Sequence, residues 1–162
     1  MAFSNFIKPN IVAQTTGSAE ISWNLDIDGC STIEPLTSFN SKSTGLLTYS
    51  NFNISSIPSV RSDGSTATTI NGIECKIICG KDARIVDSVV QLAQGGSLIG
   101  KNKASSTTGE VHTYGSSKDL WGTSLTYADL SSLQVSVKYK SGSIPHKDTC
   151  YVYSVHLKIH YS

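Results

Sequence analysis

One segment with a two-residue alternation limits what this chain can fold into. In residues 73–79, apolar side chains at the odd positions alternate with Glu74 and Lys76. Successive side chains of a β-strand point to opposite faces, so this pattern predicts a strand with one buried face. A second such segment, Asp87 to Leu92, is closed by Gln94-Gly95-Gly96, and Asn71-Gly72 predicts a tight turn before the first. We expect the remaining strands to pack on this pair.

Several other segments also read as strands with turn residues between them. They are 20–26, 46–54, 98–103, 133–140 and 149–161, and the last has Tyr151, Tyr153, Val155, Leu157, Ile159 and Tyr161 on one predicted face. Residues 118–120 and 127–130 read as single helical turns. Only 15% of the residues are charged, against about a quarter in typical domains, and Ser, Thr and Gly, which are poor helix formers, replace them. We therefore predict an all-β protein, an antiparallel β-sandwich of about seven or eight strands.

Four short motifs also occur in a familiar order. They are NGIECKI at 71–77, DSVVQLAQGGSLIGKNKA at 87–104, YGSSKDLWG at 114–122 and HLKIHYS at 156–162. Together they resemble a β-jelly-roll module of tailed-bacteriophage virion proteins, over roughly residues 67–161. Such modules serve as capsid cement or decoration proteins and as domains of tail and fibre proteins. The resemblance implies a jelly-roll sandwich, a partner in the major capsid protein, and a homotrimer.

The chain divides into an N-terminal segment, residues 1–17, and one sandwich domain, residues 18–162. The segment lacks alternation, contains the apolar residues Phe3, Phe6 and Ile7, and is interrupted by Pro9. Two interpretations stay open, a frayed terminus and an arm that docks these three side chains on a neighbouring subunit. The virion resemblance favours the arm.

The four cysteines are interpreted in two ways. Cys75 and Cys79 are four residues apart on one strand face, about 13 Å between Cα atoms, which is too far for a disulfide. We expect both to be small buried apolar residues. A disulfide between Cys30 and Cys150 is the alternative for the other two, in a mature particle outside the reducing cytoplasm.

The sequence lacks a set of residues that indicates catalysis. GGSLIGK at 95–101 matches the first part of a phosphate-binding loop, but Asn102 stands where that motif needs Ser or Thr, and residues 103–110 form a poor helix. We expect its glycines to form a hairpin or bulge. The acidic turn at 26–29 lacks the last ligand of a calcium loop. His156 and His160 share the polar face of one strand and should face solvent, and they are four residues apart on that strand, which is too far for them to share a metal directly.

The composition also limits the partners. The formal net charge is +1, without a basic run, so we expect no nucleic-acid partner. The sequence has neither a signal-peptide pattern nor an apolar stretch long enough for a membrane helix, so we expect synthesis in the host cytoplasm, no membrane partner and no cofactor.

These observations favour a non-enzymatic virion protein, a capsid cement or decoration protein that stabilises the head shell. The alternative is a tail-fibre or baseplate module that binds a host-surface glycan. Trp121, in the loop Asp-Leu-Trp-Gly, bears on the choice. Its indole either plugs the end of the sandwich or stacks on a sugar ring.

Overall fold

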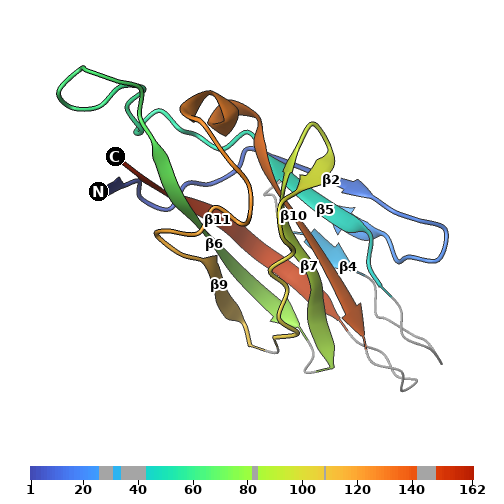
Figure 1. Ribbon diagram of the computed structural model, residues 1–162. Coiled ribbons are helices and arrows are strands. Elements are labelled where there is room, and N and C mark those ends of the chain that lie inside the picture. Colours follow the sequence, from blue (N-terminus) through green and yellow to red (C-terminus); the bar gives the residue numbers. More distant parts are fainter. Residues whose placement is uncertain (26–30, 34–42, 82–83, 108, 142–148) are drawn as a thin grey trace.

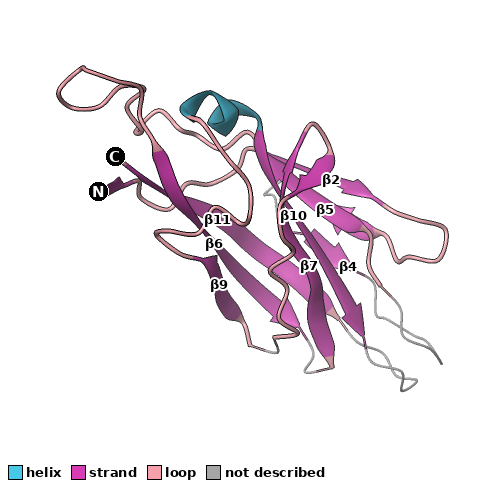
Figure 2. Ribbon diagram, viewed as in Figure 1, coloured by secondary structure: helices cyan, strands magenta, loops and turns pink. Residues whose placement is uncertain are grey.

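The computed structural model describes residues 1–25, 31–33, 43–81, 84–107, 109–141 and 149–162, and every structural statement below refers to these residues (Figure 1). They form two antiparallel sheets that pack face to face, and Figure 2 shows that strands make up nearly all of the regular structure. The six-stranded sheet has the order β3 (Trp23–Leu25), β4 (Ser31–Ile33), β11 (Cys150–Tyr161), β6 (Ile70–Lys81) and β9 (Val111–Gly115), with β1 (Ala2–Phe3) also paired to β11.

The five-stranded sheet has the order β2 (Ile11–Thr15), β5 (Leu46–Ser50), β10 (Leu133–Ser141), β7 (Ile85–Gln94) and β8 (Ser97–Ile99). A short 3-10 helix, η1 (Tyr127–Ser132), leads into β10. The predicted all-β sandwich of two antiparallel sheets is confirmed, and so is the helical turn near residue 127. The jelly-roll connectivity stays a prediction. Residues 118–120 do not form the predicted helical turn: residue 118 ends a turn, and residues 119 and 120 are irregular.

The long central strands supply most of the core. The predicted inner face of β6 is at most 1% exposed at each of its four positions, Ile73, Cys75, Ile77 and Cys79. Across the sandwich, β7 and β10 contribute Val90, Leu92, Val135 and Val137, all fully buried. The interpretation of Cys75 and Cys79 as buried apolar residues is confirmed, and burial raises the pKa of both thiols.

Strand β11 switches faces partway along, which the sequence pattern did not predict. Its register against β6 shifts between Val152 and Ser154, where a β-bulge adds a residue. Val152 points into the core before the bulge and Val155 after it. Tyr151 and Tyr153 therefore lie on the exposed side, 38% and 55% exposed, so their predicted inward placement is wrong. The same shift buries Cys150, which was expected on the more polar face.

Asn71-Gly72 does not form the predicted turn but lies inside β6. The glycine is needed for a different reason: the backbone of Ser116 and Ser117 passes so close that a Cβ at position 72 would overlap it. By contrast, Gly95 and Gly96 adopt left-handed backbone conformations in the tight turn between β7 and β8. The predicted hairpin at this phosphate-loop-like stretch is confirmed.

Trp121 is completely buried and joins the two sheets. Its indole N–H donates to the Ile73 carbonyl of β6 at 2.9 Å, and its own carbonyl accepts from the Lys101 N–H, just beyond β8, at 2.6 Å. Its backbone is left-handed, with φ at +59°, and is held by a 2.7 Å hydrogen bond from its N–H to the Asp119 carboxylate. The indole is a plug of the sandwich, and it is not available to stack on a sugar.

We expect Trp121→Ala to lower the free energy of unfolding by about 3–5 kcal/mol, because it removes a large buried side chain and leaves a cavity. Trp121→Phe is the matched control: it keeps most of the volume but leaves the Ile73 carbonyl without its donor, and should cost less. Chemical denaturation of the three proteins gives the values. Equal stability of wild type and Trp121→Ala would contradict the plug.

Gly115 and Gly96 provide a second test, since both have φ at +80°. A Cβ at Gly115 would overlap the Ile73 carbonyl and lie 2.6 Å from the Trp121 indole nitrogen, whereas a Cβ at Gly96 would meet nothing within 4 Å. Alanine at either site carries the left-handed backbone cost of about 1–2 kcal/mol. We expect Gly115→Ala to cost about 1–3 kcal/mol more than Gly96→Ala in denaturation experiments, because of the clash. Equal costs would contradict the tight contact.

Candidate partner-binding surface

The N-terminal segment is built into the sandwich of its own chain. Residues 2 and 3 pair with the end of β11, and Figure 1 shows the two termini at the same end of the molecule. Ser4 donates its N–H to the Ile159 carbonyl at 2.9 Å and accepts the Ile159 N–H on its hydroxyl at 3.0 Å. Ile7 exchanges two backbone hydrogen bonds with Leu157. The segment then crosses to the other sheet, where residues 11–15 form β2 beside β5.

This pairing separates the three apolar residues that the sequence singled out. Ile7 is 8% exposed and packs in the core of its own chain, so the expectation that its side chain docks on a neighbouring subunit is wrong. Phe3 and Phe6 are 60% and 39% exposed. Phe3 and Phe6 are each next in the chain to a residue that turns toward the sheet, Ser4 and Ile7, so both rings are turned outward. Residues 4–6 are not in a strand, which is why the two rings share the outer side although they are three residues apart. Docking of Phe3 and Phe6 on a partner stays a prediction.

Two lysines hold these rings against the outer face of the six-stranded sheet. The Lys158 ammonium of β11 lies 4.3 Å from the centre of the Phe3 ring and 5.6 Å from that of Phe6. The Lys76 ammonium of β6 lies 5.4 Å from the Phe6 ring. These are cation–π distances, and each contact contributes about 0.5–1 kcal/mol at an exposed site. The rings therefore have a preferred position although they are open to solvent.

Next to Phe3 lies a polar pair, a buried histidine and a partly buried glutamate. The His160 Nε2 is 2.5 Å from the Glu74 carboxylate, and the imidazole is 5.8 Å from the Phe3 ring, centre to centre. His160 is 6% exposed, so the expectation that it faces solvent is wrong. The reason is that β1 covers this end of the polar face. Glu74, the carboxylate of this region, is thereby engaged by His160.

His156, next to Lys76 in the strand pairing, reports the local charge. Partial burial lowers its pKa, and the positive charges of Lys8 and Lys76 lower it further, because a second positive charge is unfavourable there. We call the group Phe3, Phe6, Lys8, Lys76, His156 and Lys158 the Lys–Phe surface. It combines exposed aromatic area with positive charge, which suits it to binding a partner rather than to acid–base chemistry.

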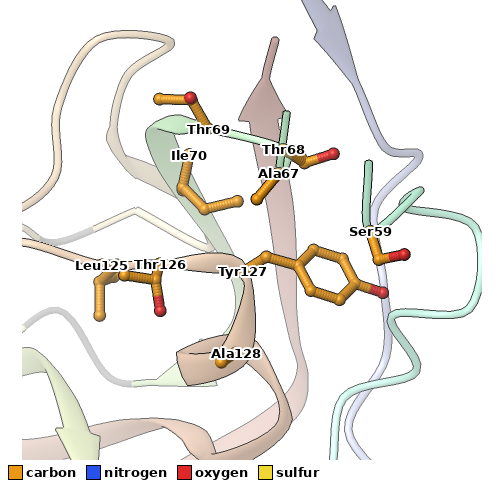
Figure 3. A pocket seen from close by; sticks show the side chains of 9 residues that line it. All are labelled: Ser59, Ala67, Thr68, Thr69, Ile70, Leu125, Thr126, Tyr127 and Ala128. Carbon is orange, nitrogen blue, oxygen red and sulfur yellow. The ribbon is translucent and has the colours of Figure 1, made fainter. Parts of the chain in front are cut away.

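A separate pocket of about 420 Å³ lies at the end of the sandwich near η1. Figure 3 shows its lining, which is Ser59, Ala67, Thr68, Thr69, Ile70, Leu125, Thr126, Tyr127 and Ala128. Its hydroxyls are engaged in the fold: the Tyr127 hydroxyl donates to the Ile57 carbonyl at 3.1 Å, and Thr126 is bonded to Asp129. The lining holds no acid, histidine or cysteine, so none of these side chains is available in the pocket for acid–base or nucleophilic chemistry.

Asp87 is the most deeply buried carboxylate of the described residues, at 1% exposure. It accepts the N–H groups of Ser105 and Thr107 at 2.9 and 2.6 Å and the Tyr114 hydroxyl at 3.1 Å. Burial, together with this carboxylate, raises the pKa of the Tyr114 phenol. The carboxylate thus fixes a loop between the sheets, and its oxygens are occupied by donors.

The remaining candidates are placed as follows. Cys30, and with it the proposed bridge to Cys150, lies outside the described residues, as does the acidic turn at 26–29. Within the described part, no group of three or more His, Cys, Asp or Glu side chains is arranged to hold a metal. The described helix is too short to cross a membrane.

The fold and this surface define an all-β sandwich protein with an aromatic, positively charged outer face. No protein-family model matches the chain, and neither a curated protein nor a solved structure is significantly similar to it.

The charge of the Lys–Phe surface can be measured at His156. We expect its pKa to lie below the ordinary value of 6.5 in a titration followed by NMR of the imidazole protons. Lys76→Gln should raise this pKa, since it removes one of the positive charges, and Lys118→Gln, at an exposed lysine elsewhere, should leave it unchanged. If the pKa of His156 were the same in Lys76→Gln as in the wild type, Lys76 would not lie close enough to affect the His156 imidazole.

Proposed function

We propose that the protein is a non-enzymatic structural protein of a tailed bacteriophage, a cement or decoration protein that binds the major capsid protein on the head of the virion. The assignment to a virion rests on the four motifs of residues 71–162 and their resemblance to virion jelly-roll modules. The two-sheet sandwich agrees with the architecture that this resemblance implies. A tail-fibre or baseplate module that binds a host glycan remains the alternative.

The observation that carries the proposal is the exposure of Phe3 and Phe6 on a rigid support. Burying one such side chain contributes about 1.5–3 kcal/mol. Because residues 2–4 and 7 are already paired with β11, little backbone freedom is lost when a partner covers this segment. A surface of this kind binds without rearrangement, which suits a protein that reinforces a preformed shell.

A homotrimer is part of the proposal. Three copies around an axis would present three Lys–Phe surfaces to a lattice with matching symmetry. Linked contacts of this kind raise the overall affinity beyond that of one copy, provided the geometry allows all of them to engage. The low density of charge limits repulsion between the copies.

The experiment is co-sedimentation with virus particles that have been stripped of the protein. Deleting the arm would also remove Ile7 from the core, so substitution is the cleaner test. We expect Phe3→Ala/Phe6→Ala to bind at least tenfold more weakly, as the loss of about 1.4 kcal/mol or more would give. Val60→Ala/Leu98→Ala is the matched control, because these two side chains are 49% and 42% exposed elsewhere.

If the Phe3→Ala/Phe6→Ala variant binds the stripped particles at full occupancy, the Lys–Phe surface is not the surface that attaches the protein to them. If the wild-type protein is found on tails and never on heads, the tail-fibre alternative replaces the proposal. Thermal melts of each variant check that the sandwich stays folded.

A further inference from the structure

We infer that the Lys–Phe surface binds an extended acidic segment of a partner polypeptide, one that presents carboxylates and apolar side chains on the same face. This inference rests on the proposed function for the role of the surface, and adds the chemistry of what covers it. It follows from how the lysines, the rings and the carboxylate of this face are arranged.

The first argument is the unequal pairing of the lysines. Elsewhere, Lys103 forms an ion pair with Asp119 at 2.6 Å, and Lys138 forms one with Glu20. In the described part of the chain, neither Lys76 nor Lys158 has a carboxylate within ion-pair distance, and the nearby Glu74 is bonded to His160. Lys8, Lys76 and Lys158 therefore bring three positive charges to the surroundings of His156 and the two rings. The carboxylates of an acidic partner would supply the opposite charges that these lysines lack.

The second argument is spacing. Lys76 and Lys158 approach the same Phe6 ring, at 5.4 and 5.6 Å from its centre, from neighbouring strands. Side chains two positions apart in an extended segment lie on the same face, about 7 Å from each other. When a carboxylate and an apolar side chain stand two residues apart in such a segment, they share one face, so the carboxylate reaches the ammonium groups while the apolar side chain contacts the phenylalanine rings. Apolar area and charge are then satisfied by the same partner.

The third argument concerns the class of partner. Proteins that bind single-stranded nucleic acid stack bases on open aromatic faces along a basic groove. Here lysine ammonium groups lie over the rings of Phe3 and Phe6, and the chain as a whole is nearly neutral. The surface therefore favours an acidic polypeptide over a nucleic acid.

The test uses a fluorescent synthetic peptide of the repeat Glu-Ser-Leu-Ser, which has Glu and Leu on one face when extended, and binding to the full chain is followed by fluorescence anisotropy. We expect Lys76→Gln/Lys158→Gln to weaken binding roughly fivefold to twentyfold, since exposed ionic contacts are individually weak. Raising the salt from about 0.05 M to about 0.5 M should weaken the wild type as well, because screening shortens the range of the charges. Lys118→Gln/Lys140→Gln, which changes two exposed lysines elsewhere, should bind like the wild type.

Three results would overturn the inference: no binding of this peptide, equal binding by Lys76→Gln/Lys158→Gln, or tighter binding of the same repeat with Lys in place of Glu or of a labelled oligothymidylate. Particle sedimentation separates this from the proposed function. Suppose that Phe3→Ala/Phe6→Ala no longer sediments with heads, whereas Lys76→Gln/Lys158→Gln still sediments at full occupancy in high salt. The cement role then stands, and the inference of an acidic partner is wrong. If the wild type binds the acidic peptide through its lysines but never heads, the cement role is wrong and the inference stands.

Discussion

The hydrogen bond from the Trp121 indole to the Ile73 carbonyl is the constraint on which the end of the sandwich depends. It ties a loop to β6, and the Trp121 carbonyl ties the same loop to the segment after β8. A Cβ at Gly115 would overlap the Ile73 carbonyl and the indole, and one at Gly100 would overlap the Trp121 carbonyl, so neither position has room for a side chain. Local strain at Trp121 itself, a left-handed backbone, is offset by burial of the indole and by the Asp119 carboxylate.

The closed end and the outer face of the six-stranded sheet are linked through β6 and β11. Their inner positions face the core, and their outer positions carry Glu74, Lys76, His156 and Lys158. The N-terminal segment pairs beside β11 and lays two aromatic rings across those polar side chains. A well-packed core therefore supports a surface whose geometry is fixed from below, so that its charges and rings keep their spacing.

Much of the fold could be predicted from alternation alone, because every second residue is buried in β6 from Ile73 to Cys79 and in β10 from Leu133 to Tyr139. Prediction failed where tertiary contacts override the local signal. Asn71-Gly72 is a strong turn signal, yet at Gly72 the requirement comes from the backbone of Ser116, far along the chain. The bulge in β11 is of the same kind: a one-residue shift reverses the faces of Tyr151 and Tyr153, and no residue type marks the position.

Only part of the candidate surface could be predicted from the sequence, and the reason is the same. Phe3 and Phe6 stand out as apolar residues in an irregular terminus, but Lys76 and Lys158 belong together only because β6 pairs with β11. The terminus itself was interpreted as an arm because its alternation is broken, whereas its pairing partner is supplied by the other end of the chain. One pairing thus has two effects: it buries Ile7, which stabilises the fold, and it exposes the adjacent Phe6, which leaves aromatic area for a partner. Stability and binding are therefore coupled in the same few residues, and a partner that covers Phe3 and Phe6 would also hold β1 against β11.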